Sequence, residues 1–152
     1  MIVVKEDPCN ELQIIKDTCR SATKLGLFPE FKHFLDDEDM FDDQLCTFES
    51  FLDLKNCNVH LIHAYDTDSK EQAFSVVRYP TYDVHVPGPG LVMMFTISGS
   101  TNPRLIASIF KEVKEACRLL DLHWYMDSRK VGEYKYENRY HVLNTDAFKL
   151  NK

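Results

Sequence analysis

The chain has 152 residues, of which 44% are hydrophobic and 28% charged, and its net charge is −6. This composition is typical of a single soluble globular domain, and the acidic balance argues against a protein that binds nucleic acid through a basic surface. The N-terminal MIVVKEDP becomes charged too early for a secretory signal, and the longest apolar run, Leu91–Phe95, is far shorter than a membrane span. We therefore expect a cytoplasmic protein, with buried thiols at its scattered cysteines, Cys9, Cys19, Cys46, Cys57 and Cys117.

The first third of the chain predicts one strand followed by two helices. The β-rich run Ile2–Lys5 reads as a strand, and Asn10 is placed to cap a helix that Gly26 ends. The apolar face of that helix recurs at helical spacing, at Leu12, Ile15, Cys19, Ala22 and Leu25. After Phe28-Pro29, a second helical region has its apolar face at Phe41, Leu45, Phe48 and Leu52.

An acidic cluster, DDEDMFDD, occupies residues 36–43. It would repel phosphate backbones, which makes nucleic-acid binding through this part unlikely. Acidic side chains favour the positive end of a helix dipole, so the cluster fits a solvated helix start. Two other interpretations stay open: a carboxylate metal site, although no calcium loop with its turn glycine is present, and a contact for a basic partner. Both would use Asp36, Asp37, Asp39 and Asp43.

The middle of the chain predicts three strands in succession. Val59–Tyr65 and Ala73–Tyr79 are separated by the turn-rich DTDSK and should pair as a hairpin. After Pro80 the segment TYDVHV is expected to continue the second strand beyond a bend, and PGPG at 87–90 predicts a turn. Leu91–Ser98 is almost entirely apolar, as a central strand covered on both faces should be.

The last part predicts a helix, a strand and a tail of uncertain structure. Asn102-Pro103 is a capping residue followed by proline at the first helical position. The helix has its apolar face at Leu105, Ile106, Ile109, Phe110, Val113, Cys117 and Leu120. A strand is expected at His123–Asp127, whereas the tail SRKVGEYKYENRYHVL is compatible with helix or strand. The order β-α-α-β-β-β-α-β predicts one α/β (α+β) domain with a mixed central sheet.

This order resembles the GNAT acyltransferase superfamily. The core of that family runs strand, two helices, three antiparallel strands, a helix, and a strand splayed from its neighbour. The resemblance covers about residues 2–127 and implies a GNAT-like single domain over residues 1–152, with 128–152 as a closing tail. In that family, backbone amides of the loop before the third helix hold the pyrophosphate of acetyl-CoA at a helix N-terminus.

The corresponding loop in this chain, ISGSTNPR, departs from the family pattern. The pattern has Arg or Gln, two residues, Gly, one residue, then Gly or Ala, whereas here Gly99 stands alone and Pro103 lacks an amide donor. An acyl-CoA site would use Gly99, Ser100, Thr101, Asn102 and Arg104. The alternative is a tight strand-to-helix turn with a cap.

The tail carries a second resemblance. The segment WYMDSRKVGEYKYENRYHVL is similar to the ends of GNAT-like small proteins among the virion and morphogenesis genes of tailed bacteriophages, some of which have lost the cofactor loop. Its aromatic and basic residues would form either a closing strand packed on the sheet or a surface for a partner. That surface would comprise Trp124, Tyr125, Arg129, Lys130, Tyr134, Tyr136, Arg139 and Tyr140.

Other candidates for chemistry are few. His60 and His63 stand three apart in a predicted strand and so face opposite sides, which argues against a shared metal ion. If the protein is an acetyltransferase, the resemblance implies a tyrosine as general acid after the fifth strand, namely Tyr134, Tyr136 or Tyr140. A carboxylate or histidine base is missing from Leu91–Ile97, which counts against catalysis.

Together these observations favour a non-catalytic structural or protein-interaction component, of a bacteriophage particle or its assembly, built on a GNAT-like fold. Such a component needs no cofactor and no metal, and its partners would be other proteins rather than membranes or nucleic acid. One alternative is an active acetyl-CoA-dependent N-acetyltransferase with an atypical pyrophosphate loop. Another is an acidic regulator that binds a host protein through residues 36–43.

Overall fold

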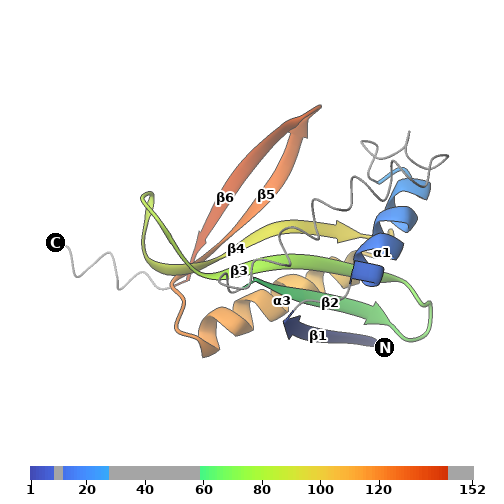
Figure 1. The fold of residues 1–152 in the computed structure, drawn as a ribbon, viewed down its shortest axis with the longest axis horizontal. Coiled ribbons are helices and arrows are strands. Elements are labelled where there is room, and N and C mark those ends of the chain that lie inside the picture. The colour runs from blue at the N-terminus through green and yellow to red at the C-terminus, as the bar shows by residue number, and fades with distance from the viewer. Residues whose placement is uncertain (9–11, 28–58, 144–152) are drawn as a thin grey trace.

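The structure is a computed structural model that describes residues 1–8, 12–27 and 59–143. The predicted second helical region, the acidic cluster with Asp36, Asp37, Asp39 and Asp43, and the capping Asn10 all lie outside these residues. The elements within them are β1 (Ile2–Pro8), α1 (Leu12–Lys24), β2 (Val59–Asp66), β3 (Gln72–Asp83), β4 (Val86–Ser98), α3 (Pro103–Leu119), β5 (Trp124–Gly132) and β6 (Lys135–Val142) (Figure 1).

The six strands form one mixed sheet, in the order in which they occur along the chain. Neighbouring strands are antiparallel, except that β4 and β5 run parallel, because α3 returns the chain to the starting end of β4. The predicted α+β class with a mixed sheet is thereby confirmed. The predicted strands at Ile2–Lys5 and Val59–Tyr65 correspond to β1 and β2, and β1 extends further than expected.

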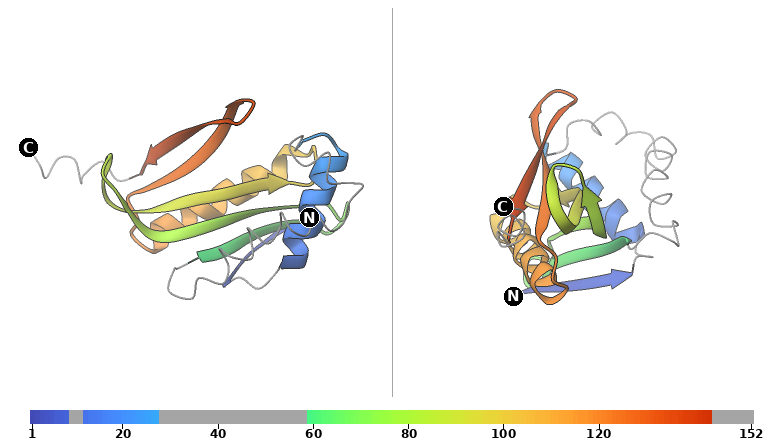
Figure 2. Two further views of the ribbon diagram at one scale, coloured as in Figure 1. Left: turned by 45° about the horizontal axis from the view of Figure 1, so that its top comes forward. Right: turned by 90° about the vertical axis from the view of Figure 1, so that its left-hand side faces the viewer.

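The two helices cover opposite faces of the sheet (Figure 1, Figure 2). Successive residues of a strand point to opposite faces, so Leu61 packs with the α1 residues while its neighbour Ile62 packs with the α3 residues. The α1 side of the core is Ile15, Cys19, Ala22, Leu61, Phe74, Val76 and Ile97. In β4, Ile97 faces α1 whereas Leu91 and Met93 face α3. This strand is therefore buried on both faces, as its almost entirely apolar sequence predicts.

Helix α1 ends at the predicted glycine. Gly26 has φ +73°, its amide bonds the Thr23 carbonyl, and the Leu27 amide bonds the Ala22 carbonyl. This pair of bonds is a Schellman motif, which requires the left-handed conformation that glycine adopts at little cost. Of the predicted apolar face, Ile15, Cys19 and Ala22 are buried, whereas Leu25 lies beyond the helix and is exposed.

Helix α3 begins as the sequence predicts. The Asn102 side chain accepts a hydrogen bond from the Arg104 amide, and Pro103 occupies the first turn. Leu105, Ile109, Val113 and Cys117 are buried against the sheet, in agreement with the predicted apolar face. The exception is Leu120, which is exposed because it caps the C-terminus of α3 after the helix has ended.

The predicted turn at PGPG is wrong. The chain reverses at Val84 and His85, between the paired residues Asp83 and Val86, and residues 87–90 belong to β4. The glycines instead permit close packing, because a Cβ on Gly88 would collide with the ring of His123 and one on Gly90 with that of Trp124. Gly88 also has φ +79°, which glycine adopts at little cost, so residues 87–90 form an irregular part of β4 that packs against the start of β5.

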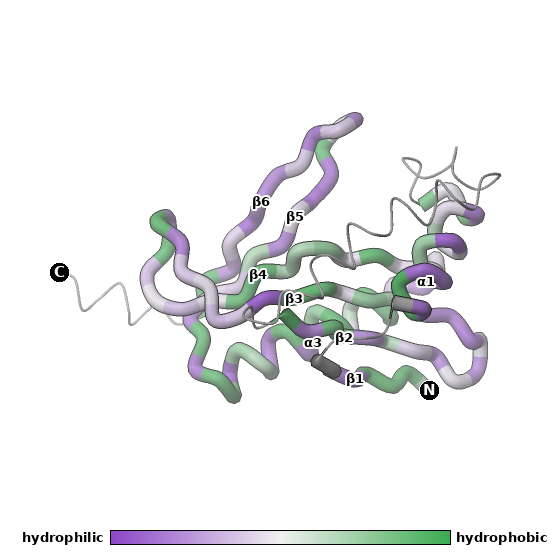
Figure 3. The backbone as a smooth tube through the Cα atoms, viewed as in Figure 1, coloured by the Kyte–Doolittle hydropathy of each residue, from purple (hydrophilic) through white to green (hydrophobic). Residues whose placement is uncertain are grey.

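The tail forms a β-hairpin. Strand β5 runs past the predicted Asp127 to Gly132, and β6 returns antiparallel to it, which settles the choice between helix and strand. β4 and β5 pair only where Gly90–Val92 meets Trp124–Met126, and beyond that point the β5–β6 hairpin leaves the sheet (Figure 1). Its outer half is mostly hydrophilic, unlike the central strands (Figure 3).

Candidate functional site

A cavity lies where β4 ends, beside the last turn of α1. Its volume is about 360 Å³, and it is lined by Ala22, Leu27, Thr96, Ile97, Ser98, Ser100 and Thr101. The lining therefore includes the predicted loop residues Ser100 and Thr101, but none of the lining side chains is ionisable. Such a cavity can accept a neutral or weakly polar group, and it offers no cation to a phosphate.

The amides of the β4–α3 loop are used within the protein. The Gly99 amide bonds the Gln72 carbonyl, the Ser100 amide bonds the Ser98 hydroxyl, and the Asn102 amide bonds the Ser100 hydroxyl. The amides of Arg104 and Leu105 then bond the side chain and the carbonyl of Asn102. Pro103 has no N–H to donate. Of the remaining positions from 99 to 105, Thr101 is the one whose amide meets no acceptor within the described residues.

Gly99 has a packing role in this loop. A Cβ at this position would lie 3.1 Å from the Cβ of Ser21, 3.2 Å from the Gln72 carbonyl oxygen and 3.4 Å from that of Thr18. The missing side chain thus allows the end of β4 to approach the backbone of α1 and of β3 closely. This contact accounts for the glycine without a ligand.

The divergence of β4 and β5 leaves one edge of β4 without a paired strand. Residues 93–98 bond β3 on one side, and within the described residues no strand pairs with their other side. The side chains in this part of β4 include no carboxylate, histidine or other ordinary general base. A base for amine deprotonation would therefore have to come from another element.

The predicted partner surface divides into buried and exposed residues. Trp124 and Tyr125 are only 1% and 3% exposed, so their side chains belong to the core and not to a surface. They are buried because Trp124 covers Gly90 and Tyr125 joins the cluster under α3. Tyr140 is half-buried, and the residues that remain exposed are Arg129, Lys130, Tyr134, Tyr136 and Arg139.

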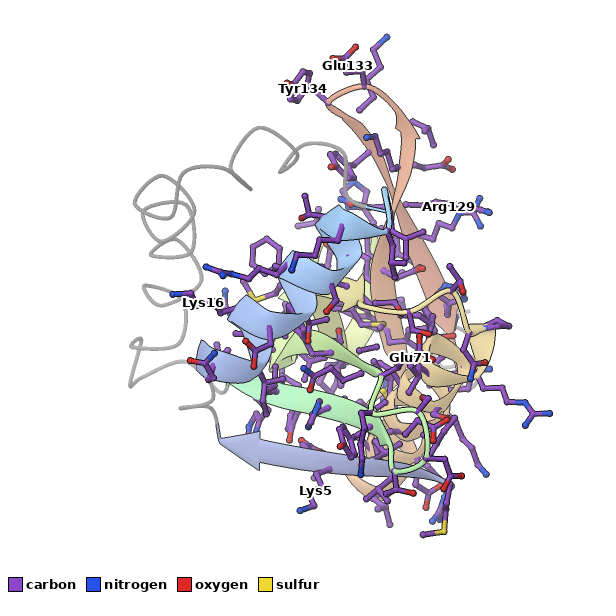
Figure 4. All side chains as sticks on the ribbon, turned by 90° about the vertical axis from the view of Figure 1, so that its right-hand side faces the viewer. Lys5, Lys16, Glu71, Arg129, Glu133 and Tyr134 are labelled. Atoms are coloured by element: carbon purple, nitrogen blue, oxygen red, sulfur yellow. The ribbon has the colours of Figure 1, made fainter. Side chains whose placement is uncertain are left out.

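The tip of the hairpin has a backbone conformation that is unusual for its residue. Tyr134 has φ +55° and is 77% exposed, and Tyr136 is 56% exposed. Figure 4 shows Glu133 and Tyr134 at the far end of the hairpin, away from the body of the sheet. A bulky residue in the left-handed region is strained, and such strain is a reason to look for a role of the side chain.

The third tyrosine considered as a general acid, Tyr140, already has a partner. Its hydroxyl donates to Asp83 (2.7 Å), and the pKa of Tyr140 is raised, first by this bond and then by burial. The bond, together with those from the amide and ring of His85, lowers the pKa of Asp83 to about 2. Tyr140 is thus a fixed donor that ties β6 to the β3–β4 turn. The sequence gives no signal for this pair, because 57 residues separate its members.

Two further polar clusters lie on the face that α3 covers. The Tyr79 hydroxyl donates to Glu6, and burial, followed by this bond, raises the pKa of Tyr79. The His60 ring stacks on the Tyr79 ring. On the hairpin, His141 stacks on Tyr125 and bonds Asp127 (2.9 Å). The Glu6–Tyr79 bond joins β1 and β3, which are distant in sequence, whereas the His141 contacts join the two strands of the hairpin.

His60 and His63 contact different partners. His60 packs on Tyr79, whereas His63 bonds the side chain of Gln72 on the neighbouring strand. No group of three or more His, Cys, Asp or Glu side chains in residues 1–8, 12–27 and 59–143 is arranged to hold a metal ion. Within these residues, no helix has the length and apolar character needed to span a membrane.

Comparison with known proteins adds no relationship to these observations: no protein-family model matches the chain, and no curated protein matches it significantly.

Proposed function

We propose that this protein acts by contact with other proteins, on a GNAT-like fold whose cofactor loop has become a structural turn. Support for the fold comes from the parallel pair β4–β5, which diverges after Val92 as the splayed strands of that family do. The resemblance of the tail to phage virion and morphogenesis proteins favours a bacteriophage particle, or its assembly, as the setting.

The observation that carries the proposal is the state of the amides between residues 99 and 105. A pyrophosphate cradle depends on several free N–H groups at a helix N-terminus, where they act together with the helix dipole. Here five of these amides donate to protein acceptors, and Pro103 has none to offer. To bind a diphosphate, the loop would have to exchange existing bonds for new ones, and that exchange returns little net free energy.

The exposed β5–β6 hairpin supports the contact role. It presents Tyr134 and Tyr136 together with Arg129 and Arg139, and aromatic and arginine side chains contribute most to protein interfaces. A tyrosine in a conformation that favours glycine costs stability, and such local strain is common at functional sites, which fits a contact role for the exposed tip.

Titration calorimetry with acetyl-CoA tests this proposal. We expect no heat of binding at protein and ligand concentrations that detect a Kd of about 1 mM, and no rise in melting temperature with added ligand. Free CoA and ADP serve as matched ligands, because they share the diphosphate. A Kd in the micromolar range for acetyl-CoA would refute the contact role as stated.

That result would favour the second candidate, an acetyl-CoA-dependent N-acetyltransferase. The observation behind this alternative is the cavity of about 360 Å³, which adjoins both the loop and the open edge of β4. In that case, exchange of Thr101, which lines the cavity and whose amide meets no acceptor within the described residues, for proline should abolish binding.

A photo-crosslinking experiment tests the contact surface directly. With p-benzoylphenylalanine in place of Tyr134, we expect a covalent product with a specific neighbour in the cells that naturally produce the protein. The same probe in place of Lys114, on the exposed side of α3, is the control. Equal products at both positions, or none at Tyr134, would contradict a role for the hairpin tip. A product of twice the chain mass would report self-association.

A further inference from the structure

We propose that the open edge of β6 pairs with β6 of a second copy of this chain, antiparallel and about a two-fold axis at Asn138. The two sheets would then join into one continuous sheet through the β5–β6 hairpins. This inference concerns a strand edge and not the loop, so it does not depend on whether the protein binds acetyl-CoA.

β6 is the last strand of the sheet, and within the described residues it pairs only with β5. Most of its residues, from Lys135 to Arg139, are exposed. A long exposed edge offers unpaired N–H and C=O groups, and folded proteins either protect such an edge or use it for association.

The alternation of the hairpin ladder determines which groups of β6 face outward. The Leu143 amide donates to the His123 carbonyl (2.8 Å), and the register between the two strands is regular from Trp124 to Lys130. Bonded and non-bonded pairs alternate in an antiparallel ladder, so the backbone groups of Tyr136, Asn138 and Tyr140 point to the open edge. With a two-fold axis at Asn138, the backbone groups of these three residues can bond those of the same three residues in the second copy.

The sequence around Asn138 is complementary to itself. The segment Tyr-Glu-Asn-Arg-Tyr, residues 136–140, reads as aromatic, acidic, amide, basic and aromatic. Antiparallel pairing about Asn138 sets Glu137 against Arg139 of the second copy, twice, and Tyr136 against Tyr140 of the second copy, twice. Opposite charges and aromatic side chains directly across two strands stabilise their pairing.

The charges are also available for this pairing. Glu137 and Arg139 make no ion pair with any described residue, and Asp127, opposite Arg139 on β5, is bonded to His141. The proposed interface would bring four strands side by side, with a row of charged side chains running across them. In order, this row would contain Asp127 of β5 and Arg139 of β6, then Glu137 of β6 and Arg129 of β5 from the second copy. The signs alternate along this row, and the symmetric row repeats it in reverse.

Asn138 suits the position on the axis. Its side-chain oxygen accepts from the Ser128 hydroxyl (2.8 Å), which leaves the side-chain amide hydrogens without an acceptor among the described residues. On the axis, each Asn138 can donate to the side-chain oxygen of the other. The contact is isologous, so it closes with two copies and does not extend into a fibre.

Sedimentation analysis of the full chain over about 1 μM to 1 mM tests the proposal. We expect a dimer whose dissociation constant rises with salt, because ion pairs at an exposed edge are screened. Glu137→Arg sets arginine against arginine, and Arg139→Glu sets glutamate against glutamate, so each variant alone should weaken the dimer roughly tenfold or more. Equimolar mixing should restore a heterodimer, since the two variants complement each other.

Two substitutions of Asn138 provide a second test, and both should leave the fold intact. The Asn138 amide points outward, so Asn138→Pro should leave the hairpin intact and abolish the dimer, whereas Asn138→Ala should retain it in weakened form. Circular dichroism verifies that each variant is folded. A wild-type protein that stays monomeric at 1 mM would overturn the proposal. So would a dimer that is indifferent to Glu137→Arg, or single variants that fail to associate on mixing.

Discussion

Gly90 of β4 lies directly against the indole ring of Trp124 on β5. A Cβ on Gly90 would come within 2.1 Å of the ring, and the indole N–H donates to the carbonyl of Gly88, two residues earlier (3.0 Å). Gly90 and Trp124 are also paired in register in the short parallel ladder between the two strands. This contact therefore positions the hairpin that leaves the sheet.

Gly90→Ala should destabilise the protein by about 3 kcal/mol, since the ring has to move out of a filled site. The free energy of unfolding in urea measures the loss, and tryptophan fluorescence should report a more exposed Trp124. Gly132→Ala is the matched control, because a Cβ there meets only ordinary contacts at 3.6 Å and beyond. Equal losses in the two variants would contradict the proposed role of Gly90.

The contact between Gly90 and Trp124 explains why PGPG predicts a turn where the structure has a strand. Proline and glycine dipeptides ordinarily mark turns, and nothing local distinguishes a glycine needed for a turn from one needed for a close approach. The indole that requires Gly90 stands 34 residues later in the chain. By contrast, the Gly26 stop and the Asn102-Pro103 start of the helices were predicted, because their hydrogen bonds lie within a few residues.

The candidate site likewise has features that the local sequence predicts and features that depend on residues distant in the chain. The absence of the glycine pattern from the loop could be read directly from ISGSTNPR, but the acceptors that use its amides could not, since the Gln72 carbonyl belongs to another strand. The tail was ambiguous because its exposed hairpin lacks a buried face, and with it the alternation of apolar and polar residues that identifies a strand. Trp124 and Tyr125 looked like interface residues, yet tertiary packing buries both.

Tyr134→Gly should stabilise the isolated protein by about 1 kcal/mol, because it relieves the left-handed conformation of the tyrosine. Thermal unfolding measures the gain. The neighbouring Glu133→Gly is the control and should be destabilising, since Glu133 is not in the left-handed region. A loss of stability in Tyr134→Gly would mean that the ring makes a stabilising contact in the isolated chain.

Tyr140→Phe should make stability less sensitive to acid. The pKa of Asp83 falls from 3.8 to about 2 on folding, chiefly because of the Tyr140 hydroxyl. A carboxyl with a depressed folded pKa stabilises the protein fully above its unfolded value, and that contribution is lost as the pH falls from about 4 towards 2. Urea midpoints from pH 6 to pH 2.5 should therefore drop less in Tyr140→Phe. Tyr136→Phe, which changes an exposed residue, should match the wild type.

Cys19 and Cys117 should resist thiol reagents in the folded protein. Both are fully buried, and burial raises the pKa of Cys19 to about 12 and that of Cys117 to about 11, so the reactive thiolate is scarce. In a variant that keeps only these two cysteines, labelling at pH 8 should be at least about a hundredfold slower than in denaturant. Rapid labelling without denaturant would show that one of these helices opens readily.

Ser100→Ala should cost about 1–2 kcal/mol, because the Asn102 amide loses its acceptor, the Ser100 hydroxyl, at a site that is only 4% exposed. Urea unfolding measures the cost, and Ser108→Ala is the control, since the Ser108 hydroxyl bonds a helix carbonyl at an exposed position. The variant also frees the Asn102 amide in the loop that lines the cavity with Ser100 and Thr101. If occupied amides are what prevent diphosphate binding, Ser100→Ala should bind CoA measurably better than the wild type does. A stability loss without any gain in CoA binding would shift the explanation to the missing cation in the cavity lining.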